Sequence, residues 1–191
     1  MITHRVDQYA ADVVAGRVVA GPLVRLACQR HQRDRAAETD PAALYAFSAP
    51  AADHIIQFFE EVLRLPDTLG PDGEPVPFLL TPANTFIVGS LFGWRKRADG
   101  YRRFREAYIE MGKGNGKTPV LAGIGLYGLM MDGEPAAEIY SAATSREQAR
   151  IMWTDAKRMV EVSELASQIE ATVGNLLHGA SFSFLPRIVR I

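Results

Sequence analysis

The sequence predicts an α/β fold: a parallel sheet with flanking helices, preceded by a helical N-terminal segment. Two observations support this fold. Apolar residues recur at helical spacing through most of the first third of the chain, where glycine and proline separate the helices. After Arg103 the pattern changes to strand, helix, strand, helix, which is typical of a parallel sheet with both faces covered.

The N-terminal part reads as three helices and a loop. Helix breakers separate the apolar-periodic stretches, and a turn-rich stretch of prolines and glycines is expected to lack regular hydrogen-bond ladders. The expected helices are Val6–Ala15, a second after Gly21 and Pro22 that dissolves into the charged residues 30–40, and a third at about Ala52–Leu65, before the loop Pro66–Pro77. Thr81 and Pro82 then form a helix start, with Thr81 as the N-cap.

The C-terminal part supplies the expected strands and their helices. Residues 103–111 alternate like a strand, 117–131 are helical, 136–144 form a short strand and 145–163 form an amphipathic helix. Ser145 and Gln148 have the spacing of a capping box at the start of that last helix. Its apolar face, which includes Trp153 and Met159, is expected to pack on the sheet.

Composition limits the possible functions. The 191 residues suffice for one sizeable core with a small appendage, and 48% apolar and 23% charged residues are typical of a globular protein. The formal net charge of -1 gives no whole-chain attraction for nucleic acid or acidic membranes. Any anion-binding site is therefore expected to be local.

Cysteine content and hydropathy predict a cytoplasmic protein. The single cysteine, Cys28, cannot form an intrachain disulfide, which suits a reducing compartment. The N terminus lacks the apolar core of an export signal, and the longest apolar run, Pro119–Met131, is too short for a bilayer and contains three glycines. No membrane association is expected.

A glycine-rich loop, GKGNGKT at residues 112–118, lies between the expected strand and helix. It ends like the Walker A phosphate loop, G-x-x-x-x-G-K-[ST], in the context that this motif requires. Its glycines, Gly112, Gly114 and Gly116, allow backbone N–H groups to turn toward phosphate oxygens, and the helix dipole favours the same anion. Lys117 is expected to reach the β- and γ-phosphates of ATP as the catalytic cation, and the Thr118 hydroxyl to bind Mg²⁺.

The loop departs from the motif at Met111, where the first glycine is expected, although the chain can still turn at Gly112. The alternative is a plain strand-to-helix turn with a solvated lysine. After Thr118 we find no strand-like apolar run that ends in Asp or Glu, the Walker B element that completes the Mg²⁺ shell, because Asp132 and Glu134 lie in a turn with Gly133 and Pro135. The chain is therefore expected to be an incomplete ATPase domain.

Three segments together resemble the large subunit of the tailed-phage terminase, the ATP-driven DNA-packaging motor. They are residues 12–34, residues 80–118 and residues 140–153. In this family the phosphate loop often has an early basic residue and an asparagine before the final Gly-Lys, which are Lys113 and Asn115 here. The resemblance implies a P-loop NTPase-type sheet, with residues 1–78 as a helical leader or lid and 79–191 as the N-terminal part of the ATPase domain.

The resemblance also implies further site residues. The helix that begins at Pro82 would carry an adenine-contacting amide, here Asn84 in place of the family's glutamine, and the alternative is a first-turn residue bonded locally. Ser145 and Arg146 would lie near the nucleotide or a neighbouring subunit, whereas a plain helix cap also accounts for Ser145.

The implied function is the ATP-binding part of a motor that couples ATP hydrolysis to DNA translocation into the procapsid. The implied partners are double-stranded DNA, the small terminase subunit, the portal and further copies in a ring, all in the host cytoplasm. A full-length parent would also be an endonuclease, and the segment alone is expected to be inactive. The alternatives are a nucleotide-binding assembly module without turnover and a small-molecule phosphotransferase.

A basic tract, Trp94–Arg105, holds six lysines and arginines and one aspartate, Asp99. Contact with DNA phosphates is one interpretation, because each neutralised phosphate releases counterions. A solvated basic face is the more ordinary interpretation.

Overall fold

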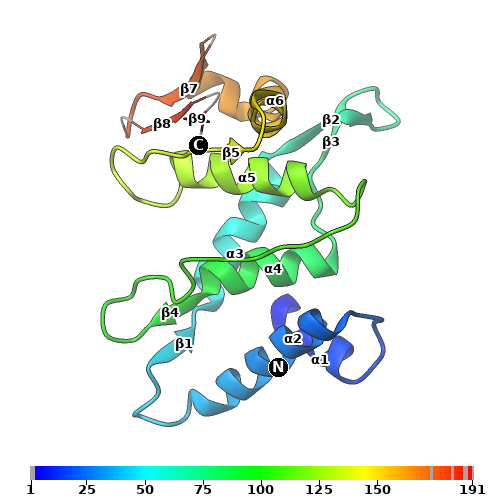
Figure 1. The fold of residues 1–191 in the computed structure, drawn as a ribbon, viewed down its shortest axis with the longest axis vertical. Helices are drawn as coiled ribbons and strands as arrows, with labels where there is room; N and C mark the ends of the chain where they lie inside the picture. Colours follow the sequence, from blue (N-terminus) through cyan, green and yellow to red (C-terminus); the bar gives the residue numbers. More distant parts are fainter. Residues whose placement is uncertain (1–2, 173, 182, 187–188, 191) are drawn as a thin grey trace. The chain divides into compact units, whose positions relative to one another are not determined.

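The structure is a computed structural model that describes residues 3–172, 174–181, 183–186 and 189–190. The chain divides into two compact units, and Figure 1 labels their helices and strands. Unit 1 comprises Met1–Gln57 and Leu80–Ile109, and unit 2 comprises Phe58–Leu79 and Glu110–Ile191.

Unit 1 consists of four helices and one small antiparallel strand pair. Its elements are α1 (Arg5–Val14), α2 (Pro22–Ala37), β1 (Tyr45–Phe47), α3 (Ala49–Gln57), α4 (Pro82–Gly93) and β4 (Trp94–Lys96). Helix α1 packs on both α2 and α4, and α3 packs on α4. Strands β1 and β4 pair so that Phe47 lies opposite Trp94. The helical N-terminal segment predicted from the sequence is confirmed.

Close helix packing in unit 1 depends on two glycines of α4. A Cβ atom on Gly89 would lie 2.4 Å from the Val6 side chain of α1, and one on Gly93 would lie 2.6 Å from the Phe47 ring. Val6 is completely buried, so the two helices could not approach this closely around a larger residue.

The helix start predicted at Thr81 is confirmed, since its hydroxyl accepts a hydrogen bond from the Asn84 N–H at 3.2 Å.

Unit 2 consists of two main helices, short helical turns and several small sheets. Its elements are the π-helical turn η1 (Phe58–Val62), β2 (Arg64–Leu69), β3 (Pro75–Pro77), α5 (Lys117–Met130), β5 (Ala142–Ala143), α6 (Arg146–Glu161), the 3₁₀ turn η2 (Glu164–Ser167), β6 (Ile169–Ala171), β7 (Asn175–His178), β8 (Ser183–Pro186) and β9 (Val189–Arg190). Both main helices were predicted from the sequence and are confirmed.

Helix α6 packs against α5 with the apolar face that its sequence predicts. Trp153 is 6% exposed and Met159 is 1% exposed. The expected packing partner was a sheet, and the structure instead brings α6 onto a neighbouring helix and onto short strands. Helix α5 permits this because it is apolar on nearly every side and carries glycines where other groups approach.

The predicted parallel sheet is not found among the described residues. The only parallel pair there joins β5 to β9 over two residues each, whereas β2–β3 and β6–β7–β8 are antiparallel. The strand expected at residues 103–111 is wrong, since the structure has no strand there, and the isolated bridge between Arg95 and Arg102 lies just before that segment. Alternation alone does not make a strand when no neighbouring strand accepts its hydrogen bonds.

Two more boundaries differ from the sequence-based expectation. The segment Pro66–Pro77 is a bulged hairpin and not a loop. Both strands of a two-stranded ribbon are edge strands, where the missing N–H of proline is tolerated. Helix α2 continues through the charged residues to Ala37, since His31 on its inner face is buried in the core of unit 1. Within the described residues, no helix combines the length and apolar character that crossing a bilayer requires.

Candidate functional site

The glycine-rich loop of unit 2 forms a tight turn directly before α5. Gly114 has a φ of 85° and Gly116 a φ of 71°, whereas Lys113 and Asn115 do not have positive φ values. Residues with positive φ thus alternate with residues without it, and this turns successive backbone N–H groups toward the same side. Backbone nests that bind anions have this geometry. Only glycine adopts such φ values without strain, so the sequence pattern has a direct structural cause.

A side-chain contact holds the loop closed. The Asn115 amide Nδ2 donates to the Gly112 carbonyl oxygen at 3.3 Å. A Cβ atom on Gly112 would lie 3.1 Å from the same Nδ2 atom, so glycine also suits this position sterically. The asparagine therefore stabilises the turn and does not itself point out of the loop as a ligand.

The N terminus of α5 has no side-chain cap. Gly116 is its N-cap residue and no side chain caps the helix, whereas Thr81 caps α4 and Ser145 caps α6. Within the first turn Pro119 has no N–H, and Val120 donates to the Gly116 carbonyl at 3.2 Å. The N–H groups of Lys117 and Thr118 thus lie at the positive end of the helix dipole.

The loop side chains suit an anion. Lys113 and Lys117 are both exposed and Thr118 is half-buried at the helix start. Among the described residues, histidine, cysteine and carboxylate side chains do not gather in groups of three that could hold a metal ion. A metal at this loop would therefore depend on the Thr118 hydroxyl and on oxygens of the bound anion.

Asn84 belongs to unit 1, in the first turn of α4, whereas the loop residues belong to unit 2. The residue is 7% exposed. Its backbone N–H is bonded locally to Thr81, but its side-chain amide has no hydrogen-bonding partner within the part of the chain that the structure describes. An amide can both donate and accept hydrogen bonds, so this side chain has the chemistry to contact a ligand.

At the start of α6, Ser145 acts as a helix cap, which is one of its two sequence-based interpretations. The Ser145 hydroxyl accepts a hydrogen bond from the Gln148 N–H at 3.2 Å, which confirms the helix cap. The Gln148 side chain accepts from the Thr144 hydroxyl at 2.9 Å and so does not complete a capping box. The side chain of Arg146 lies outside what the structure describes.

Much of the basic tract is engaged inside unit 1. The Arg97 guanidinium donates to the Glu38 carbonyl oxygen, and Arg103 pairs with Asp34 at 2.7 Å. The Arg103 guanidinium also lies 4.3 Å from the centre of the Tyr45 ring. These two arginines stabilise unit 1 through internal contacts. The sequence pattern alone did not distinguish them from the other basic residues of the tract.

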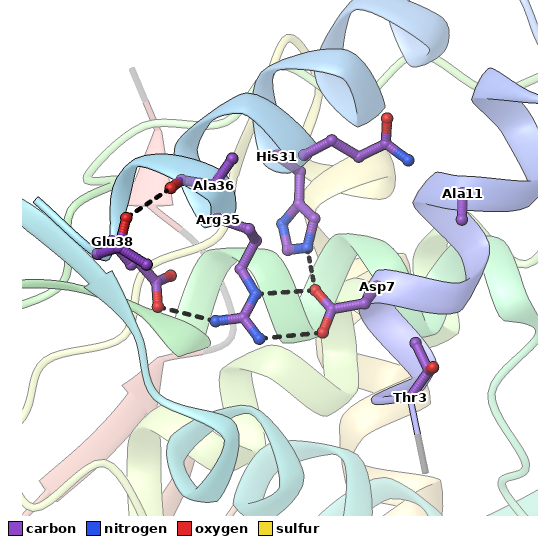
Figure 2. Close-up of a pocket in the computed structure, with 9 residues that line it drawn as sticks. Thr3, Asp7, Ala11, His31, Arg35, Ala36 and Glu38 are labelled. Carbon is purple, nitrogen blue, oxygen red and sulfur yellow. Dashed lines mark hydrogen bonds and ion pairs between the residues drawn. The ribbon is translucent and has the colours of Figure 1, made fainter. Parts of the chain in front are cut away.

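Unit 1 also contains a charged network that the sequence interpretation missed (Figure 2). Trp94 Nε1 donates to His31 Nδ1 at 3.0 Å, so the His31 proton lies on Nε2, 2.7 Å from an Asp7 oxygen. Arg35 binds the Asp7 carboxylate through two nitrogens and Glu38 through a third. The only sequence signal was the spacing of His31, Arg35 and Glu38, which places them on one helix face.

The network borders a pocket of about 590 Å³ on unit 1. Burial raises the pKa of Asp7, but the hydrogen bonds from His31 and Arg35 outweigh it and lower the pKa to about 2. The charged groups satisfy one another, with the second Glu38 oxygen accepting from the Phe47 N–H at 2.9 Å. The arrangement stabilises the helix pair and leaves no unused group for chemistry.

Comparisons with known proteins identify the family that the segment around this loop resembles. Residues 82–176 match the family model for the terminase large subunit ATPase domain, and this range includes the whole glycine loop. The crystal structure of the HK97 bacteriophage large terminase matches with a TM-score of 0.59 and 23% sequence identity over 72% of this chain. A search of curated proteins found no match.

The structural match covers 27% of the HK97 protein, so the chain spans about a quarter of the length of that terminase. At this identity the match shows a shared fold, and the family model carries the assignment. Residues 82–176, which contain the glycine loop and helices α4 and α5, thus match the ATPase domain family of terminase large subunits.

Proposed function

We propose that this chain is the ATP-binding part of a DNA-packaging motor, in which ATP hydrolysis drives translocation of double-stranded DNA into a procapsid. The observation that carries the proposal is the uncapped N terminus of α5, preceded by glycines at two positive-φ positions, Gly114 and Gly116. This arrangement offers backbone N–H groups and a helix dipole to a phosphate chain.

Each loop residue has a distinct role in the proposal. Gly112, Gly114 and Gly116 let the backbone surround the phosphates. Lys117 neutralises charge on the β- and γ-phosphates, which lowers the cost of charge that develops during phosphoryl transfer. Lys113 adds a second, more peripheral cation, and Asn115 holds the turn closed.

Mg²⁺ and the adenine base complete the proposed ligand. The Thr118 hydroxyl is the protein group offered to Mg²⁺, which prefers oxygen ligands and usually keeps phosphate oxygens and water in its shell. When bound, the ion neutralises charge on the phosphates. The amide of Asn84 can accept from an adenine amino group and donate to a ring nitrogen, as the shorter equivalent of a glutamine.

The partners in the proposal follow from the family. A full-length motor of this kind would act as a ring of identical subunits, together with the small terminase subunit and the portal, on duplex DNA. Its remaining catalytic acid and its nuclease would come from other parts of the parent protein. The 191 residues are thus proposed to supply nucleotide binding and only part of the hydrolytic machinery.

Calorimetric titration with ATP and Mg²⁺ tests the proposal. Wild type is expected to bind, and Lys117→Ala to lose about 2 kcal/mol of binding free energy, as expected for one charge-assisted phosphate contact. Lys157→Ala is the matched control, because Lys157 is another partly exposed lysine of unit 2, on α6. Equal affinities for wild type and Lys117→Ala would refute the assignment of the loop.

A further inference from the structure

A cluster of arginines from two distant segments meets on the surface of unit 1. Arg30 and Arg33 lie one turn apart on the exposed face of α2. The Arg30 guanidinium lies 4.7 Å from the centre of the Phe104 ring, and that of Arg103 lies 5.0 Å from the same ring. Phe104 therefore joins the end of the basic tract to α2, a proximity that the sequence does not reveal.

The cluster contains more positive than negative charge. Asp34 is the acidic member that contacts it, 2.7 Å from Arg103 and 3.4 Å from Arg33. Burial lowers the pKa of Arg30, and the charges of Arg103 and Arg33 lower it further. Like charges held this close repel one another, and a bound anion would remove that repulsion.

Besides the exposed Arg30, Arg33 of the cluster and Arg105, the residue after Phe104 in the chain, are well placed for an external anion. The Arg33 side chain is 72% exposed. Arg105 is exposed and has no hydrogen-bonding or ion-pair partner among the residues that the structure describes. Arg103 is only 16% exposed and is held by Asp34, so it positions the segment and does not reach outward.

The charge imbalance extends over unit 1 as a whole. Its two segments hold 12 lysines and arginines against 8 aspartates and glutamates, a formal charge of +4. Unit 2 holds 9 against 14, a formal charge of -5. The net charge of -1 for the chain thus conceals one basic unit, and the arginine cluster lies on it.

We infer that Arg30, Arg33 and Arg105 form a contact surface for the phosphate backbone of double-stranded DNA, positioned by Arg103 and Phe104. The three exposed side chains are guanidinium forks, which bind phosphate oxygens through two donors at once. Contacts to phosphates carry no sequence information, so this contact is expected to be independent of sequence, as DNA translocation requires. The inference rests on the proposed packaging function, in which double-stranded DNA is the polyanion that the protein contacts.

Fluorescence anisotropy with a labelled duplex of about 30 base pairs tests this surface at several salt concentrations. The whole 191-residue chain is expected to bind, with an affinity that falls as salt rises. Each lost phosphate contact should reduce the slope of log K against log salt by about 0.9, so Arg33→Gln lowers it by about 1 and Arg30→Gln with Arg33→Gln by about 2.

Arg17→Gln is the matched control, because Arg17 is an exposed arginine of the same unit, paired with Asp12 and outside the cluster. It is expected to leave the slope unchanged. Equal losses for Arg17→Gln and Arg33→Gln would overturn the surface, since binding would then follow total charge. Competition by a polyglutamate peptide as strong as that by unlabelled duplex would overturn the DNA assignment in favour of an acidic protein segment.

Nucleotide titrations of the same variants separate this inference from the proposed function. Arg30→Gln with Arg33→Gln should bind ATP as wild type does, because neither residue belongs to the glycine loop. A chain that binds ATP but not duplex would contradict the surface and leave the nucleotide site intact. A chain that binds duplex through these arginines but not ATP would contradict the proposed function and retain the surface.

Discussion

The Arg35 guanidinium lies against the Asp7 carboxylate, with Nε 3.0 Å from one oxygen and Nη2 3.2 Å from the other. This two-point ion pair joins α1 to α2, residues 28 positions apart in the sequence. His31 donates to the same carboxylate from inside the core of unit 1. The pair therefore belongs to the packing of unit 1 and not only to its surface.

Asp7→Asn should destabilise the protein by about 3 kcal/mol, because it leaves the Arg35 and His31 donors without their charged acceptor. Asp12→Asn is the control, since Asp12 pairs with the exposed Arg17 and should have a much smaller effect. Denaturant unfolding measures both. Equal effects of the two changes would show that the buried network contributes nothing special.

The same carboxylate gives a pH dependence of known sign. Its pKa is lowered from 3.8 to about 2 in the folded chain, so its stabilising contribution is present above pH 4 and is lost as pH falls through 2. The shift corresponds to about 2 kcal/mol. Unfolding free energies measured across this range should fall more steeply for wild type than for Asp7→Asn, and parallel curves would contradict the network.

Trp153→Ala should cost roughly 3 to 5 kcal/mol of unfolding free energy, as other large-to-small changes in a core do. Trp153 is 6% exposed on the face of α6 that packs on α5. Ile151→Ala on the same helix is the control, since Ile151 is 52% exposed. If urea melts of the Trp153 and Ile151 variants coincided, α6 would not pack as described.

Gly123→Ala should destabilise unit 2 by about 1 to 2 kcal/mol despite the better helix propensity of alanine. Its Cβ atom would lie 2.3 Å from the ring of Phe59, which is completely buried. Gly128→Ala is the control, because its Cβ would meet only the flexible end of Ile139, at 3.0 Å. Thermal unfolding compares them, and a stabilised Gly123→Ala variant would argue against the close contact.

Phosphate release by the isolated 191 residues should stay at or near background, with or without DNA. The sequence provides the loop, Lys117 and Thr118, but after Thr118 it contains no strand-like apolar run ending in an acid to position the attacking water, since the run before Asp132 forms helix α5. A malachite green assay on purified protein measures this. Robust turnover that Lys117→Ala removes would show that a catalytic acid does lie within the chain.

Local signals in the sequence predicted the helices well. Thr81 with Pro82, Ser145 with Gln148 and the uninterrupted apolar pattern of α5 each act through neighbouring residues, so the sequence contains the whole cause. The glycine loop was predictable for the same reason, because Gly114 and Gly116 adopt φ values that other residues avoid.

Contacts between distant segments were not predictable in this way. The strand expected at residues 103–111 needed a partner strand that its own alternation does not specify. The hairpin of β2 and β3 forms in a segment whose prolines predicted that no strands would pair. The Asp7 network and the meeting of Arg30 with Phe104 depend on how α2 packs, which no short sequence window records.

The central claim, that the glycine loop binds the phosphates of ATP, is tested most directly by ¹⁵N NMR titration of the 191-residue chain. With ATP and Mg²⁺, the backbone amide signals of residues 112–118 are expected to shift most, together with the side-chain amide of Asn84. Adenosine without phosphates should leave the loop signals in place. The account would be contradicted if ATP shifted signals elsewhere while those of residues 112–118 did not move.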